Sequence, residues 1–204
     1  MVENIINFGG ECIYQKNIGE SLTSPQLKFL KSSPLEEQFP KGHFMSVERN
    51  ILHDPIMKNV REKLDEYIKY YTQKLWGISN RFELKNSWLT INSQEAYHQP
   101  HNHSNSILSL SYYLKIKSGN IFFNLEKAPI QRAWFFDYDV IKENHYNTPQ
   151  MTLPLKDNDI IIFPSHLTHG TLPNNSLEKR VTLIANYFIK GKIGSKVNLT
   201  YLEL

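Results

Sequence analysis

The spacing of apolar side chains changes along the chain and divides it into two parts. Between residues 56 and 75, apolar residues recur every three or four positions, which is the period of a helix that buries one face. Asp54 and Pro55 come just before this run, and a capping acid followed by proline favours a helix start. The pattern predicts a helix here and a mainly helical N-terminal part, about residues 1–80. The apolar positions are Ile56, Val60, Leu64, Ile68, Tyr71 and Leu75.

From about Phe82 the pattern changes to short apolar and β-branched runs. Residues typical of turns separate these runs, for example Ser118-Gly119-Asn120. Many short strands in succession predict a sandwich or jelly roll with helices on its outer face. We therefore expect a mainly β protein with flanking helices (α+β), whose jelly-roll core spans about residues 82–190. The predicted strands lie within 88–91, 108–114, 121–123, 160–163 and 181–184.

The segment from about Glu126 to Pro149 has no clear periodicity. A long irregular insertion of this kind is more often a lid or a substrate loop than a linker. Its aromatic residues are candidates for shielding a reaction from water, or for packing against the helical part. They are Trp134, Phe135, Phe136 and Tyr138, and His145 lies in the same insertion.

Length and composition narrow the class of protein. The 204 residues are enough for one domain with a buried core, and we expect a single domain over residues 1–204. A net charge of +3 is too small to indicate nucleic-acid binding, and no apolar run is long enough for a membrane span. No signal peptide is visible, and a single cysteine, Cys12, excludes an internal disulfide. The expected location is therefore cytoplasmic.

Histidines suggest a metal site in the second half of the chain. His101 and His103 are one residue apart, and side chains at i and i+2 on an extended segment point to the same side. His169 and then Arg180 follow later in the chain, and neutral imidazole is a common metal ligand. Two distant segments of a jelly roll can meet at one mouth of the barrel. The spacing alone supports equally well that His101 and His103 are loop residues and His169 a polar residue near a turn.

Two longer stretches resemble a known family. The first runs from Trp88 through Tyr97-His-Gln-Pro-His101-Asn-His103 to Tyr112-Tyr113-Leu114, and the second from Asp159 through His166-Leu-Thr-His169 to Arg180-Val-Thr182 and Asn186-Tyr187-Phe188. In order and spacing they resemble the 2-oxoglutarate and iron(II) dependent oxygenases of the prolyl-hydroxylase-like superfamily. The similarity is greatest to an uncharacterised family of similar length from bacteria and phages.

This resemblance implies a double-stranded β-helix, of the cupin-like jelly-roll type, that holds Fe(II) and 2-oxoglutarate. His101, His103 and His169 would be the catalytic metal ligands, and Arg180, Thr182 and Tyr113 would bind the cosubstrate. An arginine fork suits a buried carboxylate better than a lysine does. Tyr113 taken alone is as well explained as a core aromatic residue. The implied activity is a dioxygenase that hydroxylates a substrate while 2-oxoglutarate is decarboxylated to succinate.

One position departs from the superfamily pattern and keeps alternatives open. His103 occupies the place where the superfamily usually has a carboxylate ligand. A three-histidine site is also typical of cupin-type enzymes that use no keto acid, and it suits Zn(II) as well as Fe(II). A non-catalytic jelly-roll module is the other alternative. His98 is a possible substitute ligand, His166 could line the site, and Glu95 is the nearest upstream acid.

The partners follow less closely from the sequence. The substrate is unidentified, and a small molecule or a protein side chain would suit the same site. No nucleic-acid or membrane partner is indicated, and a long apolar helix with exposed strand edges would permit a homodimer.

Overall fold

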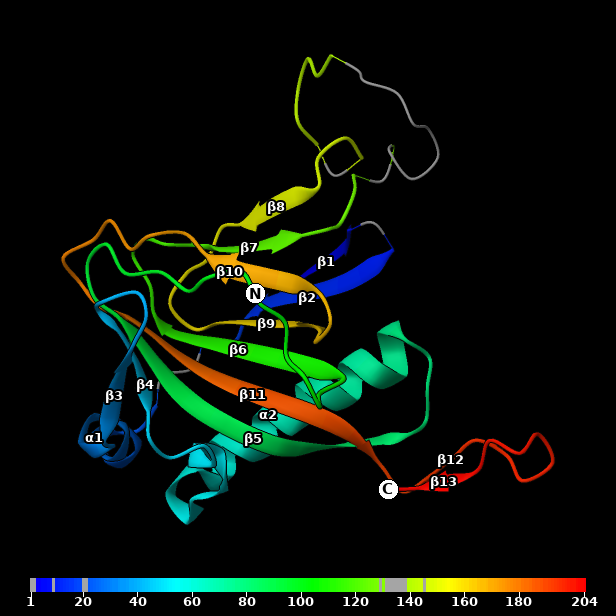
Figure 1. Ribbon diagram of the computed structural model, residues 1–204. Helices are drawn as coiled ribbons and strands as arrows, with labels where there is room; N and C mark the ends of the chain where they lie inside the picture. The colour runs from blue at the N-terminus through cyan, green and yellow to red at the C-terminus, as the bar shows by residue number, and fades with distance from the viewer. Residues whose placement is uncertain (1–2, 9, 20–21, 129, 131–138, 145) are drawn as a thin grey trace.

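Two antiparallel β-sheets form the body of the protein, and Figure 1 shows the smaller sheet stacked above the larger one. The computed structural model describes residues 3–8, 10–19, 22–128, 130, 139–144 and 146–204. Across these residues the major sheet has the strand order β1-β2-β9-β6-β11-β5-β4-β3, and the minor sheet has the order β10-β7-β8. The strands are β1 (Glu3–Phe8), β2 (Glu11–Asn17), β3 (Leu35–Gln38), β4 (His43–Ser46), β5 (Arg81–Asn92), β6 (Leu108–Lys115), β7 (Ile121–Asn124), β8 (Gln150–Leu153), β9 (Asp159–Pro164), β10 (Thr168–Thr171), β11 (Arg180–Lys190), and the C-terminal pair β12 (Lys192–Ile193) and β13 (Leu202–Glu203).

The alternation of side chains along the central strands gives the major sheet two different faces. On β11, Leu183, Ala185 and Tyr187 belong to a large apolar cluster with the helices. The residues between them point to the other face, because neighbouring side chains on a strand lie on opposite sides. That second face is covered by the minor sheet, where Phe123 of β7 packs against Phe163 of β9 with ring centroids 5.0 Å apart.

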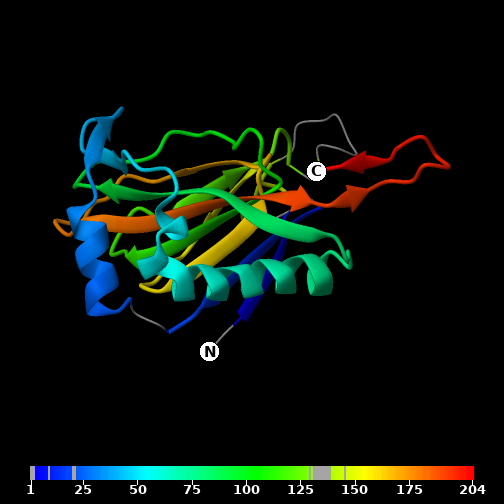
Figure 2. The same ribbon diagram turned by 90° about the horizontal axis from the view of Figure 1, so that it is seen from below.

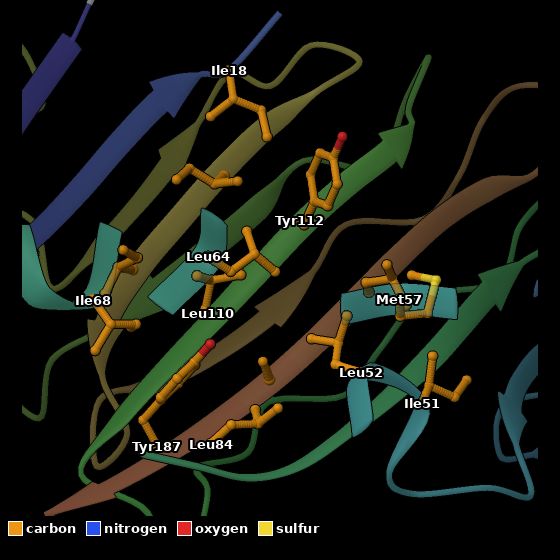
Figure 3. Packing of buried hydrophobic residues seen from close by; sticks show 14 of the residues in the cluster. Ile18, Ile51, Leu52, Met57, Leu64, Ile68, Leu84, Leu110, Tyr112 and Tyr187 are labelled. Carbon is orange, nitrogen blue, oxygen red and sulfur yellow. The ribbon is translucent and has the colours of Figure 1, made fainter. Parts of the chain in front are cut away.

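Helices cover the first face of the major sheet, as Figure 2 shows. Figure 3 shows Leu64 and Ile68 beside Leu110 and Tyr187 of the sheet. Burial of these side chains removes apolar area from water, which is worth about 1.5–3 kcal/mol for each large side chain. The helical elements are α1 (Ser24–Ser32), α2 (Lys58–Tyr70), two 3₁₀ turns, η1 (Ile51–His53) and η2 (Pro55–Met57), and a π-helical turn, η3 (Tyr71–Leu75).

The predicted helix start is confirmed. The Ile56 amide donates to Oδ1 of Asp54 at 2.9 Å, and the chain enters α2 through the 3₁₀ turn η2. This tighter turn changes the phase of the first residues, since it has fewer residues per turn than an α-helix. As a result Met57 is fully buried, while Ile56 at the predicted apolar position is exposed.

The N-terminal part, predicted as helical, contains four strands besides its helices among the residues that the structure describes. Strands β1 and β2 form a hairpin that joins the major sheet, because β2 pairs with β9. Strands β3 and β4 extend the other edge of the same sheet. Edge strands are partly exposed and carry polar residues, so their apolar periodicity is weak. The dipeptide Gly9-Gly10 in the sequence is typical of a hairpin turn, but it does not change the apolar periodicity.

The predicted mainly β fold class and each predicted strand of the second half are confirmed. Figure 1 shows them as the long central arrows β5, β6 and β11 with β7 and β9. In the insertion, Trp134, Phe135, Phe136, Tyr138 and His145 lie outside the described residues. Among the helices that the structure describes, none has the length and apolar character needed to cross a membrane.

Candidate metal centre

The second face of the major sheet presents a regular grid of side chains from β6, β11 and β5. Strand register places Arg180 opposite Asn92, and two residues further along it places Thr182 between Tyr113 and Thr90. The next rows contain Ser111, Ile184 and Trp88, and then Ser109 and Asn186. Rows two residues apart are separated by about 7 Å along the strands. The grid therefore carries several polar groups between Arg180 at one end and Asn186 at the other.

Three histidines converge above this grid. His101 and His169 exchange two backbone hydrogen bonds of 2.9 Å each, which joins the segment before β6 to strand β10. The His103 amide donates to the Ser165 carbonyl at 2.9 Å. One ring nitrogen from each of the three histidines lies within 4.8 Å of the other two. The structure thus brings together the three residues that the sequence proposed as ligands.

Each of these histidines is oriented by a partner on its Nδ1 atom. The Nδ1 of His101 lies 2.8 Å from the Gln99 carbonyl, and that of His169 lies 2.9 Å from the Leu167 carbonyl. The Nδ1 of His103 lies 2.6 Å from Oδ1 of Asn186. An acceptor at Nδ1 assigns the proton to that atom and leaves the lone pair on Nε2.

The Nε2 atoms of His101 and His103 are 3.1 Å apart. With both protons on Nδ1, two lone pairs face each other there, and a cation between them would remove the repulsion. A metal bound at about 2.1 Å to two imidazoles at a right angle holds their nitrogens about 3 Å apart. The donor set and its spacing therefore fit a metal ion.

Burial keeps the three rings in the neutral form that binds a metal. Desolvation lowers the pKa of His101, lowers that of His103 to about 4, and lowers that of His169 well below its usual value. A neighbouring charge would disfavour protonation further. The site can therefore keep its ligands deprotonated below neutral pH.

Arg180 is a buried cation beside these histidines, with 1% of its surface exposed. Its guanidinium donates to the carbonyls of Gly119 and Leu172 and to Oγ1 of Thr171. No carboxylate pairs with it in the part of the chain that the structure describes. Burial lowers its pKa to about 10, because the charged form is disfavoured away from water. An anionic ligand would offset that cost.

One pocket joins Arg180 to the histidines. It contains the other two predicted cosubstrate residues, Tyr113 and Thr182, both of which are buried. Arg180 is close enough to Tyr113 to act on its pKa, although burial dominates and raises that pKa. The pocket is lined by Trp88, Thr90, Asn92, His98, His101, His103, Ser111, Tyr113, Ile121, His169, Gly170, Thr171, Arg180, Thr182 and Ile184.

The remaining predicted candidates lie in different places. His98 lines the pocket and packs against His101 in a tilted arrangement with ring centroids 4.0 Å apart, but it is not one of the three grouped ligands. His166 is exposed and contacts Glu11 at 3.1 Å, so it faces away from the pocket. Glu95 is exposed and does not line the pocket either.

Sequence reasoning missed the residues that orient His103. Ser109 Oγ lies 2.7 Å from Nδ1 of His103 and donates to Asn186 Oδ1 at 3.0 Å. Ser165 extends this hydroxyl chain, 2.9 Å from Ser109. Asn186 belongs to the Asn-Tyr-Phe run of the family resemblance, but Ser109 and His103 are far from it in sequence. Only the strand register of β6 and β11, which pairs Asn186 with Ser109, could have predicted the contact.

Two buried nitrogens beside the site have no hydrogen-bond partner in the described part of the chain, Nε1 of Trp88 and Nε2 of His43. His43 uses its other nitrogen, Nδ1, to accept from the Asn92 amide at 2.7 Å. An unpaired buried donor costs about 1–3 kcal/mol, so each such group calls for an explanation.

The sequence matches a family model described as "Putative 2OG-Fe(II) oxygenase" over residues 86–186. The matched segment contains the three histidines, Arg180 and the grid residues of β5, β6 and β11. No curated protein matches the sequence at a significant level.

Solved structures of low sequence identity share the fold. An oxidoreductase of the 2OG-Fe(II) oxygenase family from Burkholderia pseudomallei has a TM-score of 0.58 at 10% identity, covering 80% of this chain and 76% of that one. HygX from Streptomyces hygroscopicus, solved with nickel and 2-oxoglutarate, has a TM-score of 0.60 at 8% identity, covering 89% and 83%. A prolyl-4-hydroxylase from Pseudomonas putida has a TM-score of 0.53 at 12% identity, covering 88% and 93%.

These similarities identify the fold as the double-stranded β-helix that the family resemblance implied. The family model matches the segment that contains the three histidines and Arg180. Residues 86–186 therefore match the 2OG-Fe(II) oxygenase family, and the chain has the fold of solved structures from that family.

Proposed function

We propose that this protein is a dioxygenase that uses Fe(II) and 2-oxoglutarate to hydroxylate a substrate. The observation that carries the proposal is one pocket that favours both a cation and an anion. Three imidazole lone pairs converge where a cation could bind, and a buried guanidinium would be stabilised by an anion. Fe(II) and the dicarboxylate 2-oxoglutarate would supply this cation and this anion. The family match supports the same pair of cofactors.

His101, His103 and His169 would hold the metal through their Nε2 atoms. Three protein ligands leave positions for a bidentate cosubstrate and for dioxygen. All three ligands are neutral, so the metal keeps its full charge, and the described pocket residues include no acid that would reduce it. The near carboxylate of 2-oxoglutarate would offset part of that charge, which a neutral ligand would not do.

Arg180 would bind the far carboxylate of 2-oxoglutarate. Its Nη1 atom is held by the Gly119 and Leu172 carbonyls and its Nη2 atom by Thr171, so the planar group is fixed before the ligand arrives. Thr182 follows two residues later on the same strand face and adds a hydroxyl. Tyr113 lies beside Thr182 in the register of β6 and β11. Charge-assisted hydrogen bonds from a preorganised arginine favour a carboxylate over neutral ligands.

When bound, Fe(II) and 2-oxoglutarate would supply the oxidation: one atom of dioxygen would enter succinate as the keto acid loses CO2, and the other would convert a substrate C–H bond to C–OH. The chain's own residues bind and orient. Gln99, Leu167 and Asn186 hold the three imidazole tautomers, while Arg180 fixes the direction of the cosubstrate. Apolar Ile121 and Ile184 help to keep water out of the pocket.

An anaerobic titration tests the proposal. Purified apo-protein would receive Fe(II) and then 2-oxoglutarate, while absorbance follows the weak visible charge-transfer band of the chelated cosubstrate. We expect a band in the wild type, no band in His169→Ala, and a band only at much higher 2-oxoglutarate concentration in Arg180→Ala. His166→Ala and Arg81→Ala are matched controls, because both residues are exposed and neither lines the pocket.

The outcomes separate the possible functions. A band that depends on His169 and Arg180 supports the proposal, and oxygen consumption with succinate release would complete it. Tight iron binding that depends on His169 but gives no band would instead indicate a three-histidine enzyme that uses no keto acid. Failure to bind any divalent metal would leave a non-catalytic module of this fold.

A further inference from the structure

The polar wall that β5 contributes to the pocket has no part in holding the metal or the cosubstrate. We infer that Trp88 binds the substrate, by donating its indole N–H to an uncharged carbonyl or hydroxyl oxygen next to the reacting carbon. This inference rests on the proposed oxygenase function and names the class of group that the same site would accept.

The strand register puts Trp88 at the level of the metal site. Trp88 pairs with Ile184, which pairs with Ser111, and this row lies between the row of Thr182 and the row of Asn186. Thr182 belongs to the cosubstrate end of the grid, and Asn186 orients His103. The Trp88 and His103 rings have centroids 5.7 Å apart. A molecule touching the Trp88 edge would therefore lie beside the proposed metal ligands.

The indole nitrogen indicates a ligand, because it is buried and has no hydrogen-bond partner among the described residues. Nε1 of Trp88 has no hydrogen-bond partner in the part of the chain that is described, although the residue lines the pocket. Buried indole N–H groups usually find a partner. Indole donates only and does not titrate, so its partner must be an acceptor at any ordinary pH.

The charges around the pocket restrict that acceptor to an uncharged group. Among the described lining residues the only fixed cation is Arg180, and there is no aspartate or glutamate. Arg180 would already be neutralised by the far carboxylate of 2-oxoglutarate. A cationic substrate group would then be repelled by the metal, which keeps one positive charge beside the near carboxylate of 2-oxoglutarate, and a carboxylate would bind the metal in preference to the uncharged indole. An amide carbonyl or a hydroxyl oxygen is left as the acceptor for the Trp88 N–H.

Nuclear magnetic resonance can observe the indole N–H directly. The full chain, ¹⁵N-labelled and loaded with Zn(II) and 2-oxoglutarate, would be titrated with N-methylacetamide, and separately with acetate and with methylammonium. Loss of one indole signal in Trp88→Phe assigns the resonance. Trp76 is an internal reference, since it packs against Tyr71 and Phe82 in the helix-side core.

We expect N-methylacetamide to shift the Trp88 signal downfield in a saturable way and to leave Trp76 unchanged. Acetate and methylammonium should need at least tenfold higher concentration for an equal shift. Absence of a Trp88 shift in protein that holds Zn(II) and 2-oxoglutarate would overturn the inference, as would an equal response to acetate. Failure of the proposed function is distinguishable, because it would appear earlier, as failure of the sample to bind the metal or the keto acid.

Discussion

The Nδ1 atom of His103 lies 2.6 Å from the Oδ1 atom of Asn186, and this contact fixes which ring nitrogen faces the other two histidines. Asn186→Ala leaves only the Ser109 hydroxyl beside Nδ1 of His103, and because a hydroxyl can donate as well as accept, the ring can then change tautomer. We expect metal affinity to fall roughly 10- to 100-fold, as for other residues that orient metal ligands. Competition with a chromogenic chelator measures the change.

Two further variants test whether the acceptor itself matters. Asn186→Asp retains an oxygen that accepts from His103, so its metal affinity should stay near the wild-type value. Asn86 lies opposite Asn186 on β5 but is exposed, and Asn86→Ala should have no effect. Equal loss in Asn86→Ala and Asn186→Ala would show that the strands, and not the contact, account for the result.

Leu64 attaches α2 to the major sheet on the face opposite the site, and only 1% of its surface is exposed. Leu64→Ala should lower the free energy of unfolding by about 2–5 kcal/mol, because a cavity replaces the side chain. Leu177 is 86% exposed, and Leu177→Ala should change stability by less than about 0.5 kcal/mol. Urea denaturation followed by circular dichroism measures both, and folded Leu64→Ala should bind metal normally. A loss of similar size in both variants would contradict the packing argument.

The central strands were predictable because they are buried on both faces. Strand β9 reads as a continuous apolar run from Ile160 to Phe163, as expected for a strand with both faces covered. Strand β2 buries Ile13, Tyr14 and Gln15 in succession but has polar neighbours, so neither period appears in its sequence. Its place in the sheet depends on pairing with β9, which is distant in sequence. Local pattern cannot supply that information.

The site also contains residues that the sequence predicts and residues that it does not. His101, His103, His169 and Arg180 were identifiable because their chemistry requires particular residue types at a particular spacing. The acceptors that orient His101 and His169 are backbone carbonyls, which any residue can provide, so they leave no trace in the sequence. Trp88 looked like an ordinary strand residue until the register placed it in the pocket wall.

Buried histidines should make the metal-free protein sensitive to acid. Burial lowers the pKa of His43 and His101, lowers that of His103 to about 4 and that of His98 to about 2, and lowers that of His169 well below its usual value. Between these values and about 6.5 the unfolded chain binds more protons, so stability decreases as pH falls. Each such histidine lowers the free energy of unfolding by up to about 1.4 kcal/mol for each unit by which the pH falls.

Thermal unfolding of chelator-treated protein between pH 7 and pH 5 tests this expectation. Glu83, whose pKa is lowered to about 2, contributes only below its usual value of 4.5 and lies outside this window. His98→Asn should have a shallower pH dependence than the wild type, whereas the exposed His166→Ala should match it. Equal stability at pH 5 and pH 7 would be inconsistent with neutral buried histidines.

Gly119 controls the position of Arg180 without belonging to the metal site. Its φ is +78°, and a Cβ there would overlap Nη1 of Arg180 and lie 2.7 Å from the Leu172 carbonyl. Gly119→Ala should therefore displace the guanidinium and weaken 2-oxoglutarate binding roughly 10- to 100-fold, since charge-assisted hydrogen bonds contribute about 1.5–3 kcal/mol. Isothermal titration into Zn(II)-loaded protein measures this, and Zn(II) affinity should not change.

Gly77 provides the matched control for that substitution. Its φ is +70°, but no atom lies within 4 Å of a Cβ built there. Gly77→Ala and Gly119→Ala should both lose about 1 kcal/mol or more of stability from the left-handed backbone. Only Gly119→Ala should lose cosubstrate affinity.

If both variants bind 2-oxoglutarate as the wild type does, then Arg180 either tolerates the added methyl group or does not bind the carboxylate, and Arg180→Lys distinguishes these two explanations. A lysine keeps the charge but loses the fork, so unchanged binding in Arg180→Lys would exclude the bidentate role.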